Sequence, residues 1–276
     1  MKKQIQKSIG AYFNTMSLIY PKFVAKKGFQ LFCKPMSRPL KKHQKAFLDT
    51  GMSGVLEYEN QKIQTYKWGD GTKKILLVHG WASHSFRWKA YIQNLIANDF
   101  TVYAFDAPAH GLSEGKKLHI FSYSNVIDAF MKQTTGIEYI ISHSIAGFFT
   151  LYWLFQHPDN QIKKVVIMGA PGEAKDFFDF YQKVLGLTDR ALGIIKNEFI
   201  SSLHHKLEYF SAAKFAQQVA TESLIIHDKE DQDTNYKSSV KLHENWKNSK
   251  LILTKGLGHG LKSKKLQKEV FDFVMK

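Results

Sequence analysis

The chain has 276 residues, of which 44% are apolar and 14% aromatic, which is enough to bury one large core and predicts a single main domain. Its one cysteine, Cys33, excludes an intramolecular disulfide scaffold, and we interpret it as a packing residue. No cysteine or histidine cluster has the close spacing of a structural zinc site, so no metal is expected.

The formal net charge is +15 and the pI is near 9.6, a balance that suits an anionic partner. Only Arg38, Arg87 and Arg190 are arginines, so nearly all the positive charge is lysine, which lacks the bidentate fork that reads guanine or phosphate. We therefore expect no specific nucleic-acid binding. Lysines that keep helix surfaces soluble explain most of the charge.

Residues 1–50 are rich in lysine and aromatic residues and show no strand alternation, which predicts a basic helical extension outside the sheet. Apolar residues recur on one face of its first helix, and that face either packs on the catalytic domain or lies on an anionic membrane surface: Ile5, Ile9, Tyr12, Phe13 and Met16. The segment has no continuous apolar core of a signal peptide, and no window is long and apolar enough to cross a membrane. We expect a cytoplasmic protein that is at most peripheral at the membrane.

Residues 51–276 have the pattern of the catalytic domain. The segments VLEYE and KIQTYKW alternate with period two around Asn60-Gln61, which predicts an antiparallel hairpin. Short apolar runs separated by helical stretches follow, and they predict a mostly parallel sheet with helices on both faces, an α/β fold: 75–79, 101–105, 139–142, 165–168, 224–227 and 251–254.

A long segment between the runs at 165–168 and 224–227 exceeds what one crossover helix needs. We predict that residues 172–216, after the sixth strand, form a helical cap over the carboxyl edge of the sheet. Its aromatic residues either line an apolar substrate pocket or pack in the cap: Phe177, Phe178, Phe180 and Tyr181.

Ser144 lies where a buried strand ends and the apolar helix FFTLYWLF begins. This is the setting of a nucleophile elbow, a tight turn that needs small residues two positions before and after the nucleophile. Ser142 and Ala146 fill those positions in place of glycines, so the motif is a relaxed form of G-x-S-x-G. A plain helix cap is the alternative for such a serine.

His79-Gly80-Trp81 follows one predicted strand, and D-x-P-x-H-G-x-S at 106–113 follows the next. With these motifs in order, the chain resembles the α/β-hydrolase superfamily in its serine-nucleophile branch, from about Val55 to the carboxyl terminus. The resemblance implies that Ser144 is the nucleophile and that the backbone N–H groups of Ile145 and Trp81 form the oxyanion hole. It also implies that Trp81 shapes the pocket wall and that His110 supports a loop.

The resemblance further implies an acid after the strand at 224–227 and a base after the last strand. Asp231 aligns with the acid, ahead of Asp233 and Asp228, while His227 aligns with a non-catalytic histidine of the pattern. His259 in G-L-G-H-G aligns with the base, and His143 is a poorer candidate.

These residues predict a serine hydrolase that cleaves a carboxylic ester or thioester of a small, apolar substrate through an acyl-serine, without metal or cofactor. Amidase, lipase, acyltransferase and cofactor-free peroxidase activities remain open within the same fold. The alternative from another class is a catalytically silent α/β-hydrolase that acts as a binding or membrane-surface protein. The sequence sets no expectation for the oligomeric state.

Overall fold

The computed structural model describes residues 2–36 and 39–276, which fall into two compact units. The sheet unit comprises residues 35–172 and 212–276, and the helical unit comprises residues 1–34 and 173–211. The predicted extension ended at residue 50, whereas residues 35–50 group with the sheet unit because Leu48 is fully buried in its core.

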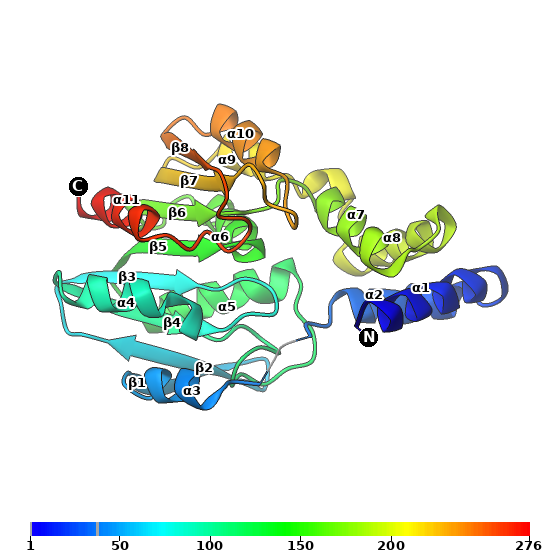
Figure 1. Cartoon of the computed structure of the whole chain (residues 1–276), viewed down its shortest axis with the longest axis horizontal. Coiled ribbons are helices and arrows are strands. Elements are labelled where there is room, and N and C mark those ends of the chain that lie inside the picture. The colour runs from blue at the N-terminus through cyan, green and yellow to red at the C-terminus, as the bar shows by residue number, and fades with distance from the viewer. Residues whose placement is uncertain (1, 37–38) are drawn as a thin grey trace. The chain divides into compact units, whose positions relative to one another are not determined.

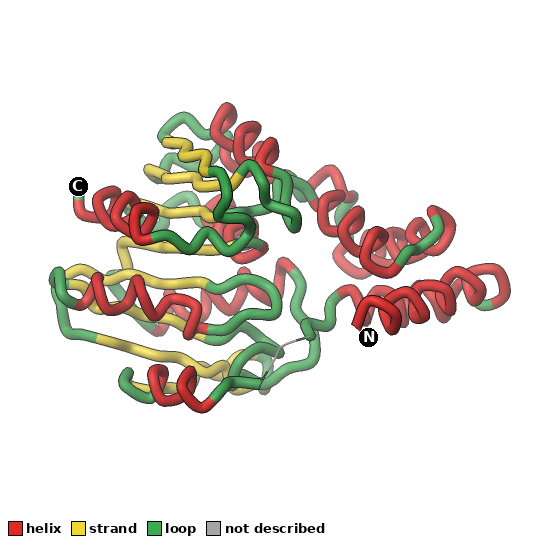
Figure 2. The backbone as a smooth tube through the Cα atoms, viewed as in Figure 1, coloured by secondary structure: helices red, strands yellow, loops and turns green. Residues whose placement is uncertain are grey.

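The sheet unit is built on one eight-stranded sheet (Figures 1 and 2). The strands are β1 (Met52–Tyr58), β2 (Gln61–Trp68), β3 (Lys73–Val78), β4 (Phe100–Phe105), β5 (Ile137–His143), β6 (Lys164–Met168), β7 (Glu222–Asp228) and β8 (Ser249–Thr254). Their order is β1-β2-β4-β3-β5-β6-β7-β8, and every pair from β4 to β8 is parallel. The predicted mostly parallel α/β sheet is confirmed.

The hairpin of β1 and β2 is antiparallel and joins the sheet through β4. Tyr58 pairs with Gln61, so the turn is Glu59-Asn60, one residue earlier than predicted. Both turn residues have positive φ, as a tight two-residue hairpin turn requires, and asparagine adopts that conformation more readily than most residues.

Helices cover both faces of the sheet (Figure 2). They are α3 (Lys42–Leu48), α4 (Lys89–Ile96), α5 (Ile120–Gln133), α6 (Ile145–Gln156), α9 (Ala212–Ala216), α10 (Tyr236–Asn245) and α11 (Lys264–Met275), with a 3₁₀ turn η1 at Ser85–Trp88. On one face, α3, α4 and α11 share a core with strand residues such as Leu77 and Ile141. On the other, Gly147 of α6 lies against Ile167 of β6. Coverage on both faces is why the central strands are solidly apolar.

The helical unit combines the amino-terminal hairpin with the segment inserted after β6. Its elements are α1 (Lys2–Ile19), α2 (Pro21–Phe32), α7 (Ala174–Leu185), α8 (Asp189–Leu203) and the 3₁₀ turn η2 (Leu207–Tyr209). The predicted cap ended at residue 216, whereas α9 groups with the sheet unit, where the Phe215 ring meets that of Phe148.

Aromatic stacking joins the two halves of the helical unit. The Phe178 ring of α7 is fully buried and stacks on Phe32 of α2 at 4.5 Å, and the Tyr181 hydroxyl donates to the carbonyl of Gly28. Gly28 is required there, since an added Cβ would lie 2.5 Å from the Ile195 side chain. Across the described ranges, no helix has the length and apolar character needed to span a bilayer.

Candidate active site

The residues singled out by the sequence motifs lie in loops that follow β3, β5, β7 and β8 of the sheet unit. Because the carboxyl ends of neighbouring parallel strands meet at one edge, these loops converge although they are far apart in the chain. Ser144, Asp231 and His259 come together at this edge.

Ser144 is the single residue between β5 and α6. Its φ of 58° and ψ of −134° are sparsely populated for a non-glycine residue and cost on the order of 1–3 kcal/mol. The turn is held by the Ser144 N–H, which donates to the carbonyl of Met168 at 2.7 Å. Ser142 and Ala146 are fully buried, which explains why small residues stand on both sides of the serine. This is the strained geometry of a nucleophile elbow.

A hydrogen-bond chain runs from the serine to a carboxylate. The Ser144 Oγ lies 2.9 Å from Nε2 of His259, and Nδ1 of His259 lies 2.8 Å from Oδ2 of Asp231. An ionised carboxylate only accepts, so Nδ1 carries the proton and Nε2 is free to accept from the serine hydroxyl. The Asp231 side chain is fully buried and that of His259 is 22% exposed, so the imidazole separates a buried acid from the accessible serine.

Asp231 receives several hydrogen bonds besides that from His259. Its Oδ1 accepts from the N–H groups of Asp233 and Thr234, and its Oδ2 accepts from the Thr234 hydroxyl at 2.9 Å. Nε2 of His227 also lies 3.3 Å from Oδ2. Burial by itself raises the pKa of Asp231, but donation from His227, His259 and Thr234 outweighs it and places the pKa far below its ordinary value. The carboxylate therefore stays ionised.

Asp228 and Asp233, the aspartates on either side of Asp231 in the sequence, have different surroundings. Asp228 is buried, and its Oδ2 accepts from the Thr254 hydroxyl and the Leu257 N–H. These hydrogen bonds connect the end of β7 to the loop after β8 that carries His259. Asp233 is exposed. Of the three predicted alternatives, only Asp231 has an oxygen within hydrogen-bond distance of His259.

Two backbone N–H groups near Ser144 have no acceptor among the described residues. One belongs to Ile145, the first residue of α6, where helix geometry leaves the N–H unpaired. The other belongs to Trp81, next to Gly80, whose added Cβ would lie 2.8 Å from the Ser144 Cβ and the His143 carbonyl. The loop after β3 thus lies directly against the elbow, with room only for glycine.

The loop that carries Trp81 is fixed from several sides. Nδ1 of His79 donates to the Gly80 carbonyl at 2.8 Å, which sets the plane of the Gly80–Trp81 peptide. Nε2 of His110 accepts from the Ala82 N–H at 3.0 Å, so His110 does support a loop. Buried Asp106 accepts from both the N–H and the hydroxyl of Ser85. Burial lowers the pKa of His79 and of His110 to about 3, so both act as neutral imidazoles.

Two residues that contact the loop after β8, which carries His259, were not assigned a role from the sequence. Nε2 of His143 lies 2.8 Å from the His259 carbonyl, and burial holds the pKa of His143 well below its ordinary value, so the neutral ring donates to that carbonyl. Arg87 donates from Nη2 to the Gly260 carbonyl at 2.9 Å, and burial lowers its pKa to about 10. The position of His143 beside Ser144 was a usable signal, whereas nothing in the sequence around Arg87 pointed to the histidine loop.

The aromatic residues predicted as possible pocket walls divide between the units. Trp81 is half-buried in the sheet unit, with its ring 5.8 Å from that of His110. Phe178 and Tyr181 pack against α2 inside the helical unit, which corresponds to the packing alternative, and Phe177 is half-buried. Within residues 2–36 and 39–276, no three His, Cys, Asp or Glu side chains are placed to hold a metal ion.

Comparison with known proteins places this geometry in context. The chain is 26% identical over 158 residues to the monoglyceride lipase of Homo sapiens, covering 51% of this chain and 52% of the lipase. It is 21% identical over 111 residues to a pimeloyl-[acyl-carrier protein] methyl ester esterase of Hamiltonella defensa, covering 40% of this chain and 42% of the esterase. The chain thus spans about half or less of the length of these curated relatives.

The fold is shared with solved structures such as that of Est1E from Butyrivibrio proteoclasticus with ferulic acid bound. The TM-score is 0.65 at 18% identity, over 80% of this chain and 98% of Est1E. The family described as serine aminopeptidase, S33, matches residues 70–212, just over half of the chain. With the sheet order and the elbow described above, the chain belongs to this family of α/β-hydrolases.

Proposed function

We propose that this chain is a serine hydrolase that cleaves carboxylic esters or thioesters of a small apolar substrate through an acyl-serine intermediate. The observation that carries the proposal is the hydrogen-bond chain from Asp231 through His259 to Ser144 on a strained elbow. Relatives named as an esterase and a lipase support an ester as the substrate.

In the first step, Nε2 of His259 takes the proton of the Ser144 hydroxyl as Oγ attacks the acyl carbonyl carbon. Ionised Asp231 holds the imidazole in the Nδ1–H tautomer and stabilises the imidazolium that forms. The carbonyl oxygen becomes an oxyanion and accepts from the N–H groups of Ile145 and Trp81, each worth roughly 3 kcal/mol of barrier.

In the second step, the imidazolium returns its proton to the leaving alkoxide or thiolate, and the acyl group stays on Ser144. A water molecule then transfers a proton to Nε2 of His259 and attacks the acyl carbon, which releases the acid and restores the serine. Neutral His143 supports both steps by holding the carbonyl of His259, which keeps the loop in place between proton transfers.

The test is covalent labelling by a fluorophosphonate, located by mass spectrometry. We expect labelling at Ser144 in the native protein and its loss in Ser144→Ala and His259→Ala, because the attack needs both the hydroxyl and its base. His43→Ala, at an exposed position outside the Ser144–His259–Asp231 hydrogen-bond chain, is the matched control and is expected to label like the native protein.

Native protein that has not been treated with the probe is then assayed on p-nitrophenyl esters of increasing chain length, an acyl thioester and an aminoacyl anilide. Turnover of the ester or thioester supports the proposal, and turnover of the anilide alone overturns the choice of substrate. Folded native protein that takes no label overturns the hydrolase assignment in favour of a catalytically silent binding protein.

A further inference from the structure

The outer side of the α1–α2 hairpin carries a surface that the proposed chemistry does not use. We define the hairpin face as Ile5, Ile9, Tyr12, Leu18, Ile19, Tyr20 and Phe23 together with the lysines Lys22, Lys26 and Lys27. All of these residues belong to α1, to α2 or to the turn that joins them.

The packing of α1 inside the helical unit fixes which side is exposed. Gly10 lies so close to α7 that an added Cβ would overlap the Leu185 carbonyl, and Phe13, three residues further along α1, is buried. The Asn14 amide donates to the Gly186 carbonyl and accepts from the Thr188 N–H, both at short distance. The opposite side of α1 is therefore held outward by the packing of the unit itself.

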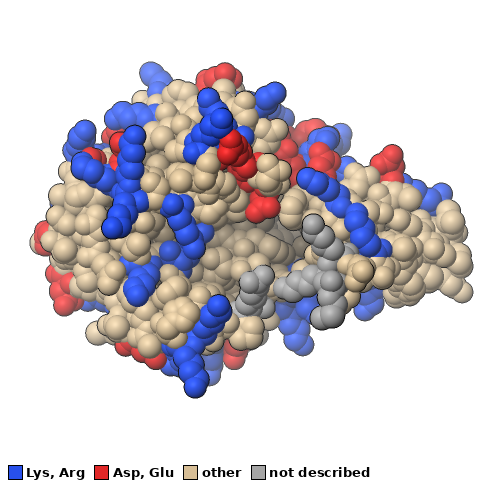
Figure 3. Space-filling model, in the orientation of Figure 1, with Lys and Arg blue, Asp and Glu red and all other residues tan. Residues whose placement is uncertain are grey.

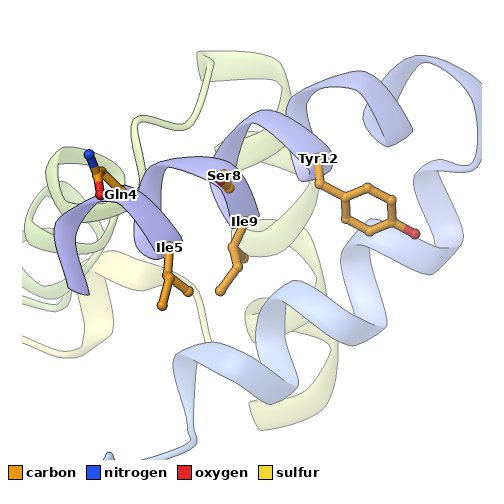
Figure 4. A pocket seen from close by; sticks show the side chains of 5 residues that line it. All are labelled: Gln4, Ile5, Ser8, Ile9 and Tyr12. Atoms are coloured by element: carbon orange, nitrogen blue, oxygen red, sulfur yellow. The ribbon is translucent and has the colours of Figure 1, made fainter. Parts of the chain in front are cut away.

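This outward side is apolar to an unusual degree. Five side chains of the hairpin face are more than half exposed: Ile5, Tyr12, Leu18, Ile19 and Tyr20. Figure 4 shows Ile5, Ile9 and Tyr12 projecting from one side of α1, where they line an open pocket of about 400 Å³ with Gln4 and Ser8. The Tyr12 ring meets the Phe23 ring of α2 edge-on at 6.1 Å, so the apolar surface is continuous across both helices. Contiguous exposed apolar surface of this kind marks an interaction site.

The charge of the hairpin has one sign. Residues 1–34 contain seven lysines and no acidic residue, whereas residues 173–211 of the same unit contain five basic and six acidic residues. Lys26 and Lys27 follow Phe23 by three and four positions, so they share its helix face. Lys22, Lys26 and Lys27 are exposed, and none has a carboxylate within ion-pair distance in the described part of the chain. Figure 3 shows that uncharged residues form most of the face in view of the helical unit.

We propose that the hairpin face binds the surface of an anionic phospholipid bilayer, with the apolar side chains at the boundary of headgroups and acyl chains and the lysines on the phosphates. Exposed apolar residues beside unpaired lysines are the composition of helices that lie in the interface without spanning it. A second copy docked face to face would bring like charges together, and a nucleic-acid groove would leave the apolar side chains in water.

The experiment is co-sedimentation of the full chain with vesicles of phosphatidylcholine alone and of phosphatidylcholine with about one third phosphatidylglycerol. We expect binding only to the anionic vesicles, weakened strongly at about 0.5 M salt, where the screening length is only a few ångströms. Each surface lysine contributes about fivefold, so Lys22→Gln/Lys26→Gln/Lys27→Gln is expected to bind on the order of 100-fold more weakly. Ile5→Ser/Tyr12→Ser is expected to lose the binding that persists at high salt.

The matched control is Lys237→Gln/Lys247→Gln/Lys265→Gln, which removes the same charge from exposed positions of the sheet unit. Equal weakening by this control overturns the proposal, because the binding would then follow net charge alone. Absence of binding to anionic vesicles at low salt also overturns it, as does a dimer in solution that Ile5→Ser/Tyr12→Ser dissociates. Unchanged circular dichroism and thermal unfolding of all variants establish that folding is not the cause, and none of these outcomes depends on Ser144.

Discussion

Asp231 owes its ionised state to donors on three sides. The buried carboxylate accepts hydrogen bonds from the rings of His259 and His227 and from the Thr234 hydroxyl. These hydrogen bonds lower its pKa by more than burial raises it. Neighbouring Asp228 is equally buried, but its oxygens are committed to Thr254 and Leu257. The role of a carboxylate at this edge is therefore set by which donors it meets, since the residue type is the same.

At this scale we predict that Asp231→Asn lowers kcat by on the order of 10³- to 10⁴-fold with a small change in KM. The asparagine amide cannot hold the Nδ1–H tautomer of His259, so Nε2 no longer accepts the serine proton. Steady-state hydrolysis of an activated ester measures the effect. Asp233→Asn is the matched control, because Asp233 is exposed and makes no contact with His259. A similar loss of kcat in both variants would contradict the assignment of the acid.

The close packing of α6 on β6 limits which side chains α6 can carry. α6 begins immediately after Ser144 and packs so closely on β6 that an added Cβ on Gly147 would lie 2.8 Å from the Ile167 side chain and 3.0 Å from Ala170. In contrast, Gly193 of α8 has no heavy atom within 4 Å of its added Cβ. Two helical glycines of one chain are thus placed in opposite environments.

We therefore expect Gly147→Ala and Gly193→Ala to change stability in opposite directions. Gly147→Ala must push strand and helix apart, which costs roughly 1–3 kcal/mol in the free energy of unfolding. Gly193→Ala adds helix propensity without a clash and stabilises by up to about 1 kcal/mol. Calorimetric unfolding of the two variants checks both values, and destabilisation by Gly193→Ala would show that α8 packs more tightly than described.

Buried neutral histidines make the stability of the whole molecule depend on pH. Burial lowers the pKa of His79 and of His110 to about 3, whereas an unfolded histidine has a pKa near 6.5. Unfolding therefore takes up a proton at each of them below pH 6.5. Their contribution to stability is fully present above that pH and is lost as the pH falls toward 3. The lowered pKa values of Asp228 and Asp231 change the dependence of the free energy of unfolding on pH only near and below the ordinary carboxylate pKa of about 4.

Urea unfolding at pH 7.5, 6 and 5 is expected to show a fall of roughly 2 kcal/mol per buried histidine across this range. His110→Gln lowers the stability at pH 7.5 through its lost hydrogen bonds, yet it should reduce the dependence on pH by about one proton. His43→Gln, which removes a histidine from an exposed position, is the matched control. An unaltered slope in His110→Gln would mean that His110 is protonated in the folded protein.

The sequence by itself determined the sheet, the insertion after β6 and the candidate residues Ser144, Asp231 and His259. Continuous apolar runs, glycines at tight turns and residues at strand ends are local signals, and they specify an α/β fold and the edge at which its loops meet. The choice of Asp231 over Asp233 followed from its place in a motif, with no information on distance.

Only the tertiary structure decided what surrounds these residues. The contact of His143 with the His259 carbonyl and that of Arg87 with the Gly260 carbonyl join segments separated by long stretches of chain. The grouping of residues 1–34 with residues 173–211 also joins segments that are far apart in the chain. The packing within this unit leaves Ile5 and Tyr12 exposed. No local periodicity records such pairings, because the contacts depend on where the sheet and the helix packing bring distant side chains.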